Sequence, residues 1–252
     1  MKCEKVKDTE FRFKEFTVSN RYSAMKVGTD GVLLGAWALH GTGFVPSTIV
    51  DAGTGTGVIA LLMAQRFTEA QIIGVEIDSN ASEEATRNFT QSSWTERLTC
   101  RNVSFGDFCR TNVPNSVKAD LLISNPPFFR NGQENDGNSR TLARHEGTLS
   151  PVALLREAPG ILSSCGRLCF VSTDDSRKEI EFEAALAGLK LERRTAVSTG
   201  EGKPPRRILW QFAMKGAKNV KATDNTLTIR YRGGAPTPEY QRLVEPYYLY
   251  VK

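Results

Sequence analysis

Ile49-Val50-Asp51-Ala52-Gly53-Thr54-Gly55-Thr56-Gly57-Val58 decides the fold, because a short apolar run leads into three glycines and then into a helical pattern. Glycine reaches positive φ and lets a ligand approach the backbone closely, so the segment is typical of a nucleotide-binding turn between a strand and a helix. Its spacing is G-x-G-x-G, whereas G-x-G-x-x-G seats a dinucleotide pyrophosphate. The turn therefore favours an α/β fold with a nucleotide-like ligand and disfavours a nicotinamide dinucleotide.

Around this turn, short runs rich in Ile and Val alternate with helical patterns, which is typical of a mostly parallel sheet. Strands are predicted at residues 48–52, 71–76, 98–103, 120–124, 167–172, 190–197 and 207–214. Helices are predicted at residues 29–39, 57–66, 80–91, 152–162 and 176–187. The last two strands are joined by a Pro/Gly-rich connection that is too short for a crossover helix, so they should pair antiparallel. We expect a parallel sheet with one antiparallel edge strand.

The segment before the first of these strands has a pattern of its own. Residues 11–14 alternate phenylalanine with a basic residue, and Ser19-Asn20 offers a turn, so a β-hairpin is expected there. A helix should follow, with Thr29 or Asp30 as its N-cap. We therefore expect residues 1–45 to form an N-terminal extension of hairpin and helix, packed on a catalytic domain of residues 46–252.

Composition sets limits on the class of protein. The 252 residues carry a net charge of +5, which is compatible with a polyanionic partner but does not require one. The five cysteines are scattered without a C-x-x-C pair, and there are only two histidines, so we expect reduced thiols and no metal site. The charged amino terminus is unlike a secretory signal, and no apolar run reaches 18 residues. We expect a monomer that is located in the cytoplasm and does not span a membrane.

Acidic residues follow the next two strands after the glycine turn. Glu76 ends the second strand and is placed to accept hydrogen bonds from the hydroxyls of a ribose. Asp78, two residues later, could instead be the N-cap of the next helix. Further along, Gly106-Asp107-Phe108 offers a carboxylate for an adenine amino group and an aromatic neighbour. Each feature alone is more often structural. Their order at successive strand ends, where open α/β sheets bind ligands, predicts an adenosyl pocket without a pyrophosphate.

Asn125-Pro126-Pro127-Phe128 follows a buried strand at the same edge of the sheet. Two prolines cannot continue a central strand, so a simple strand end is the structural alternative. The chemistry of a planar amino nitrogen explains more of the composition, because its lone pair is delocalised and must be drawn out of conjugation. The Asn125 side-chain oxygen and the Pro126 carbonyl can each accept one N–H, and Phe128 can stack on a base. No acid, metal or covalent nucleophile is needed.

The segments 51–57 and 125–128, together with Glu76 and Asp107, resemble the motifs of class I (Rossmann-like) amino-group methyltransferases. The segment 24–37, which reads AMKVGTDGVLLGAW, is similar to the amino-terminal signature of bacterial tRNA(Val) adenine N6-methyltransferases. Residues 11–16, 205–209, 227–230 and 247–249 look similar too, so the resemblance covers nearly the whole chain. Phe128 departs from the family, which often has Tyr there; the ring is kept and the hydroxyl is lost.

The resemblance implies a seven-stranded class I fold, S-adenosylmethionine as the cofactor and tRNA as the partner, with methylation of the adenine beside the anticodon. The catalytic residues that it implies are Asn125, Pro126, Pro127 and Phe128. The cofactor-binding residues that it and the motifs imply are Lys26, Gly28, Thr29, Asp51, Gly53, Gly55, Gly57, Glu76, Ile77, Asp107, Phe108 and Asn125.

Basic residues in three segments are candidates for RNA contacts, because a base in a tRNA loop needs a positive rim around the site. The long polar segment 130–149 is itself a candidate binding segment. The candidates are Arg130, Arg140, Arg144 and His145 in that segment, Lys203, Arg206 and Arg207 between the last two predicted strands, and Arg12 and Lys14 near the amino terminus. We expect these segments to converge at the strand ends.

Two other functions fit part of the pattern. A glutamine N5-methyltransferase of translation factors faces the same chemistry at an amide nitrogen, although that family usually carries a longer helical amino-terminal domain. A catalytically inert RNA-binding protein would keep the fold, although an intact Asn125 disfavours it. The basic segments favour RNA over protein as the acceptor.

Overall fold

The computed structural model describes residues 10–21, 26–112, 118–127, 149–218 and 220–251. An eight-stranded sheet with the order β10-β8-β9-β7-β6-β3-β4-β5 forms the centre of this part of the chain. Its strands are β3 (Thr48–Ala52), β4 (Gln71–Glu76), β5 (Leu98–Asn102), β6 (Ala119–Ser124), β7 (Leu162–Thr173), β8 (Lys190–Ser198), β9 (Arg207–Ala213) and β10 (Thr223–Thr228). A separate antiparallel hairpin joins β1 (Glu10–Arg12) to β2 (Thr17–Ser19).

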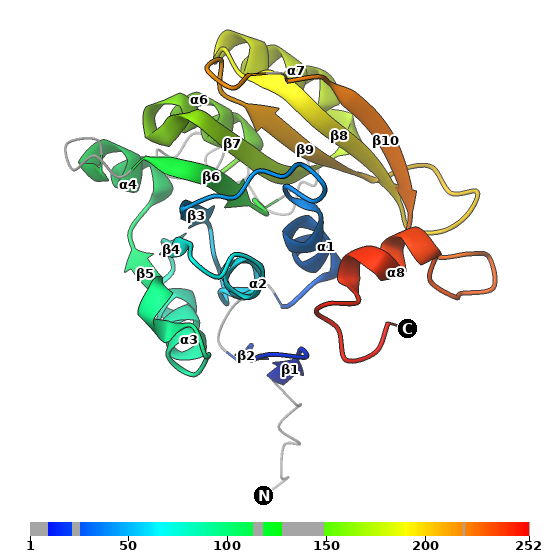
Figure 1. Ribbon diagram of the computed structural model, residues 1–252, viewed down its shortest axis with the longest axis horizontal. Coiled ribbons are helices and arrows are strands. Elements are labelled where there is room, and N and C mark those ends of the chain that lie inside the picture. Colours follow the sequence, from blue (N-terminus) through cyan, green and yellow to red (C-terminus); the bar gives the residue numbers. More distant parts are fainter. Residues whose placement is uncertain (1–9, 22–25, 113–117, 128–148, 219, 252) are drawn as a thin grey trace, which may run out of the picture.

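Helices cover both faces of the sheet (Figure 1). On one face lie α1 (Thr29–Trp37), α2 (Val58–Arg66), α3 (Ser79–Thr90) and α8 (Pro238–Val244). On the other lie α4 (Phe105–Asn112), α6 (Pro151–Ile161) and α7 (Arg177–Leu186). Successive residues of a strand point to opposite faces, so Leu121 and Ile123 of β6 pack with the first group and Leu122 with the second. Two apolar cores therefore hold one sheet between two helical layers.

The α/β fold and the antiparallel pairing of β8 with β9 confirm the sequence prediction, but the position of the reversed strand differs from it. β9 pairs antiparallel with both β7 and β8, so it lies inside the sheet and is not an edge strand. β10 adds an eighth strand beyond β8, in parallel. The sequence TDNTLT of β10 has only one apolar residue, Leu227, so it carried no strand signal. The helix α4 was also not predicted.

The hairpin and α1 occupy the positions expected of the N-terminal segment, with one difference at the helix end. Gly28, and neither Thr29 nor Asp30, is the N-cap of α1, and no side chain caps it. The Asp30 carboxylate instead accepts a hydrogen bond from Arg207 Nε at 2.8 Å. The hairpin packs on the carboxyl-terminal segment, where the ring of Phe13 stacks on that of Tyr248 with centroids 5.8 Å apart. The two ends of the described chain are thus packed together.

Among the described residues, no helix is both long and apolar enough to span a bilayer.

Candidate active site

The carboxyl ends of β3, β4 and β6 meet at one edge of the sheet, and the pairing register brings their polar residues together. Asp51 of β3 lies opposite Gly74 of β4 and Ile123 of β6. The Ser124 hydroxyl donates to the carbonyl of Ala52 at 2.8 Å, which ties the end of β6 to the start of the glycine turn. The glycine turn, Glu76 and Asn125 therefore lie at one edge, as their positions in the sequence predict.

The turn itself requires glycine. Gly53, Gly55 and Gly57 have φ values of 67, 56 and 82°, a region that residues with a side chain rarely adopt. A Cβ at Gly53 would lie 2.5 Å from Leu149 Cδ2, and one at Gly57 would lie 2.4 Å from Phe89 Cε1. At Gly55 a Cβ would meet nothing within 4 Å. The middle of the turn thus presents bare backbone to open space, where a ligand can approach it.

Glu76 orders both the turn and the helix that follows it. One carboxylate oxygen accepts from the backbone N–H of Gly55 at 2.9 Å, and the other accepts from that of Asp78 at 2.9 Å. Asp78 caps α3 through a hydrogen bond from the Ala81 N–H, as the sequence allowed. The next residue, Ile77, is 63% exposed although its side chain is large and apolar. This corner offers a carboxylate and an uncovered apolar surface side by side.

Asp51 is fully buried beneath the turn. Its Oδ2 accepts from Thr54 Oγ1 at 2.6 Å and from the Ala60 N–H at 3.2 Å, whereas Oδ1 has no hydrogen-bond partner. Burial raises the pKa of Asp51 to about 7, and the nearby charge of Glu76 raises it further, against the hydrogen bonds from Thr54 and Ala60. The unpartnered oxygen makes this a strong acceptor for a cationic or N–H group.

Asn125 also holds an unpartnered acceptor. Its Oδ1 is buried and has no hydrogen-bond partner in the part of the chain that the structure describes, while its Nδ2 lies near Gly31 of α1, where a Cβ would be 3.6 Å away. Pro126 is buried, which fixes the backbone beyond Asn125. Phe128 lies outside the described residues, as do Arg130, Arg140, Arg144 and His145. A buried amide oxygen without a donor is costly, so this oxygen is able to accept a hydrogen bond from a ligand.

Asp107 and Phe108 lie in the first turns of α4, and only one of them faces outward. The Asp107 carboxylate accepts from Ser104 Oγ and from Arg110 Nη2, each at 2.6 Å. The hydrogen bond from Ser104, followed by Arg110, lowers the pKa of Asp107. Phe108 is 5% exposed and belongs to the core beneath α4. The ring of Phe108, which was expected beside the ligand, therefore packs in the core, and only the backbone of this residue is left for binding.

A buried residue that sequence analysis missed, Asn88, joins the amino-terminal segment to the glycine turn. Asn88 of α3 exchanges two hydrogen bonds with the backbone of Ser19 and donates a third, at 2.8 Å, to the carbonyl of Thr56. The buried Glu84 carboxylate accepts from the Arg21 N–H at 2.5 Å. Asn88 and Glu84 lie on a polar helix, and no sequence signal indicated that the hairpin buries this face.

Between these contacts, Asn20 is buried with its side-chain Oδ1 unpartnered, and its carbonyl accepts from Lys26 Nζ at 2.6 Å. Lys26, Gly28 and Thr29 are exposed and lead from Asn20 into α1. The predicted segment and the glycine turn are thus brought together through Ser19 and Asn88.

The basic candidates within the described residues differ in their surroundings. Lys203 and Arg206 are exposed in the β8–β9 connection, and Arg12 and Lys14 are exposed in the hairpin. Arg207 instead forms an ion pair with Asp30, and its side chain is one third exposed. Its side chain therefore anchors the β8–β9 connection to α1, which its sequence pattern did not indicate.

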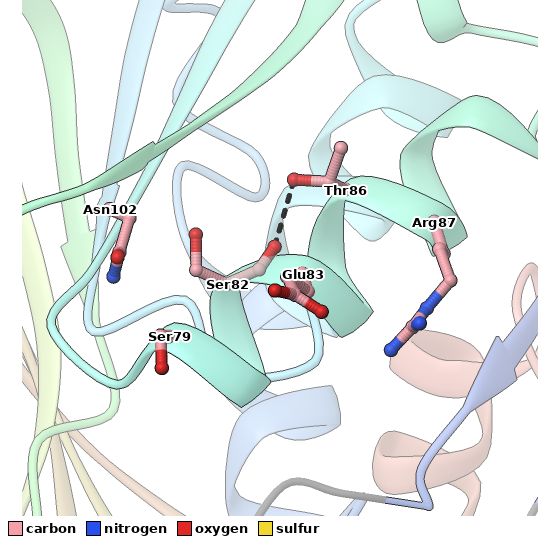
Figure 2. A pocket seen from close by; sticks show the side chains of 6 residues that line it. All are labelled: Ser79, Ser82, Glu83, Thr86, Arg87 and Asn102. Carbon is pink, nitrogen blue, oxygen red and sulfur yellow. Dashed lines mark hydrogen bonds between the residues drawn. The ribbon is translucent and has the colours of Figure 1, made fainter.

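A hollow beside α3 is lined by polar side chains. Figure 2 shows these residues, which are Ser79, Ser82, Glu83, Thr86, Arg87 and Asn102. Asn102 at the end of β5 donates to the carbonyls of Glu76 and Ile77, at 2.9 and 3.1 Å. The hollow contains none of the predicted site residues, so it adjoins the candidate site without forming it. Among the described residues, no group of three or more His, Cys, Asp or Glu is arranged to hold a metal ion.

The doubly covered sheet, the G-x-G-x-G turn with its acidic partner and the Asn-Pro-Pro segment define a class I methyltransferase. The family model described as "Methyltransferase small domain" matches residues 38–195. Among solved structures, a predicted O-methyltransferase from Agrobacterium tumefaciens has a TM-score of 0.67 at 19% identity, covering 88% of this chain and 98% of that one.

Two curated relatives are each named tRNA1(Val) (adenine(37)-N6)-methyltransferase. The protein from Porphyromonas gingivalis is 41% identical over 241 residues, 94% of either chain. That from Trichodesmium erythraeum is 38% identical over 246 residues, 95% of this chain and 98% of its own. The chain belongs to the tRNA1(Val) (adenine(37)-N6)-methyltransferase family, and it is an enzyme.

We predict that Asp51→Asn changes the pH dependence of stability. A carboxyl group whose pKa is raised on folding destabilises the folded state as the pH rises from its unfolded value of 3.8 towards about 7. Over this range, the free energy of unfolding of the variant should therefore rise relative to that of the wild type by a few kcal/mol. Urea titrations of both proteins between pH 4.5 and 8 measure it. A difference that stays constant over this range contradicts the raised pKa.

A second prediction concerns Asn88→Ala. Loss of three buried hydrogen bonds should lower the free energy of unfolding by about 2–3 kcal/mol, because Ser19 and Thr56 lose their partner. Urea titration measures this loss. Asn80→Ala is the matched control, since Asn80 is exposed on the same helix, and it should change stability by no more than about 0.5 kcal/mol. Equal stability of the two variants would refute the bridging role of Asn88.

Proposed function

We propose that this protein transfers the methyl group of S-adenosylmethionine to the N6 amino group of adenine 37 in tRNA1(Val). The observation that carries the proposal is the buried Oδ1 of Asn125 at the end of β6, which has no partner among the described residues, because such an oxygen requires a hydrogen-bond donor and an adenine amino group supplies one. The names of the relatives supply the acceptor, since each is called a tRNA1(Val) (adenine(37)-N6)-methyltransferase.

The residues around the glycine turn fit the donor. The bare backbone at Gly55 admits a ligand, and Glu76 beside it can accept from the ribose hydroxyls. Ile77 offers its exposed side chain to the adenine ring. The unpartnered Asp51 Oδ1 lies under the turn, where it can accept an N–H of the α-ammonium group. Asp107 would accept from the adenine amino group if Arg110 gives up part of its hydrogen bond to the Asp107 carboxylate. The donor supplies an electrophilic methyl group on a sulfonium ion.

In this proposal the acceptor nitrogen is activated only by the hydrogen bonds that orient it, without a general base. Asn125 Oδ1 and the Pro126 carbonyl each accept one N–H of the amino group, which turns its lone pair out of the ring plane and towards the methyl group. The N–C bond forms as the S–C bond breaks, and one amino proton then leaves to water. Pro126 and Pro127 fix the backbone so that these acceptors do not move. Phe128 would stack on the adenine and hold it in the site.

The segment before β3 completes the donor site in the same proposal. We treat residues 1–45 as an extension packed on a methyltransferase domain of residues 46–252. The contacts of Asn88 with Ser19 and Thr56 support this arrangement, because they fix the extension against the glycine turn. Lys26, Gly28 and Thr29 would then lie beside the methionine part of the donor.

Incubation with labelled S-adenosylmethionine tests the proposal directly. Unmodified tRNA and a peptide-release factor are supplied together, and the labelled nucleoside is identified by mass spectrometry. We expect N6-methyladenosine at position 37 of tRNA1(Val). Label on the release factor alone would establish a glutamine methyltransferase instead, and label on neither would indicate an inert RNA-binding protein.

We predict that Asn125→Ala loses methyl transfer but keeps the donor. Removing the acceptor oxygen should lower kcat by about 100-fold or more, by analogy with the loss of one preorganised hydrogen bond in other active sites. The dissociation constant for S-adenosylhomocysteine, measured by calorimetry, should change by less than about threefold. Asn225→Ala on the exposed edge strand β10 is the control and should behave as wild type. Wild-type turnover by Asn125→Ala would remove Asn125 from the reaction.

For Asp107→Ala we predict weaker donor binding with the fold intact. The loss of one charge-assisted hydrogen bond to the adenine amino group should raise the dissociation constant for S-adenosylhomocysteine about tenfold. Asp175→Ala, an exposed carboxylate before α7, is the control for the loss of a surface charge. An unchanged dissociation constant for Asp107→Ala would place the adenine elsewhere.

A further inference from the structure

The edge strand β10 contributes little to either apolar core. Residues 223–226 are exposed, and Leu227 is the only buried side chain in the strand. Burial of apolar surface is the main gain from adding an element to a sheet, so packing alone does not account for β10. The chain continues from β10 into a turn at the carboxyl edge of the sheet, and the strand fixes the position of this turn.

That turn is built firmly and faces solvent. The Tyr231 N–H donates to the Ala235 carbonyl at 2.8 Å, and Arg230 Nη1 donates to the Gly234 carbonyl at 2.8 Å. Residues 230–235 are all exposed, and Tyr231 is 47% exposed although its ring is large. The turn is therefore ordered by its own hydrogen bonds, one of them donated by the Arg230 side chain, while its side chains remain exposed to solvent.

The β8–β9 connection lies against this turn. The Glu201 N–H donates to the Arg230 carbonyl at 2.8 Å, and the Arg232 N–H donates to Glu201 Oε2 at 3.3 Å. A Cβ at Gly202 would lie 3.4 Å from Arg232 Nη2, so residues 201 and 202 contact the turn at Arg230 and Arg232. Figure 1 shows both segments beside α8 at the same end of β8 and β10.

Together the two segments form a basic surface, which we call the two-loop surface and define by Lys203, Arg206, Arg230 and Arg232. All four side chains belong to exposed residues, and none of them forms an ion pair within the described residues. Glu201 is the carboxylate nearest to them in the two segments, and it is engaged by a backbone N–H. Four exposed cations without an ion-pair partner among the described residues thus lie on the same two segments as the exposed Tyr231.

The two-loop surface lies at the edge that carries the active site. β8 and β10 are parallel to one another, and β8 is antiparallel to β9 as β7 is, so their carboxyl ends share the edge of Asp51 and Asn125. Arg207 links the surface to the site, because its ion pair with Asp30 joins the β8–β9 connection to the first turn of α1. At the opposite ends of the same two strands lie Lys190 and Lys221.

We propose that the two-loop surface binds the phosphate backbone of the substrate RNA outside the nucleotide that is methylated. This inference rests on the proposed function. Arginine forks match phosphate oxygens in pairs, and several fixed cations release counterions when they meet a polyanion. An exposed tyrosine between them suits an unpaired base, which single-stranded RNA offers and an acidic protein does not.

The test compares charge reversals at the two ends of the same strands. Arg230→Glu/Arg232→Glu removes the β10 side of the surface, Lys203→Glu/Arg206→Glu removes the facing side, and Lys190→Glu/Lys221→Glu reverses the same charge at the opposite edge. Fluorescence anisotropy measures affinity for unmodified tRNA between 50 and 200 mM salt. Calorimetry with S-adenosylhomocysteine reports whether each variant keeps a folded donor site.

We expect each two-loop variant to bind tRNA at least tenfold more weakly, with a slope of log affinity against log salt that is smaller by about two, and to raise KM for tRNA with an unchanged donor affinity. The opposite-edge variant should follow the wild type. Equal losses in all three variants, or in none, overturn the inference. Failure of the wild type itself to methylate tRNA overturns the proposed function instead, and binding of acidic protein in place of tRNA identifies a different partner.

Discussion

The backbone of residues 53–57 passes from β3 into α2 through three glycines at positive φ, and the rest of the candidate site is placed against it. Glu76 is held by the N–H of Gly55, and Asn88 is held by the carbonyl of Thr56. Through Asn88 the turn also holds the amino-terminal segment at Ser19. A side chain at Gly53 or Gly57 would displace Leu149 or Phe89, so the conformation of this short segment limits the position of elements from four parts of the chain.

Among the described residues, the buried oxygens without a hydrogen-bond donor include Oδ1 of Asp51 and of Asn125 at this edge of the sheet and Oδ1 of Asn20 in the amino-terminal segment. An unsatisfied buried polar atom costs about 1–3 kcal/mol, and two of these atoms lie where the chemistry is proposed to occur. The atoms are all acceptors. A donor with an α-ammonium group and an acceptor with an amino group both bring N–H groups, and binding would recover the cost. The same burial raises the pKa of Asp51 to about 7.

Elements that pack on both sides could be predicted well from sequence. The bounds of β3 and β4 agree with the prediction because each is a short apolar run between turn residues. β10 was missed because a half-exposed edge strand needs few apolar residues. Glu76 and Asn125 were predicted as site residues from chemistry and strand order, and Asp51 from the glycine-turn motif. The core position of Phe108 and the pairing of Arg207 with Asp30 depend on packing between distant segments, which sequence spacing does not report.

The polar face of α3 illustrates that limit in physical terms. Glu84 and Asn88 are one turn apart and would be assigned to solvent in an isolated helix, yet they are 0% and 1% exposed. Their partners are backbone groups of Ser19 and Arg21, more than 60 residues earlier in the chain. Burying a carboxylate and an amide is favourable only when the hairpin supplies those N–H groups. Docking of the hairpin and the conformation of the glycine turn are therefore coupled through Asn88, which bonds both Ser19 and Thr56.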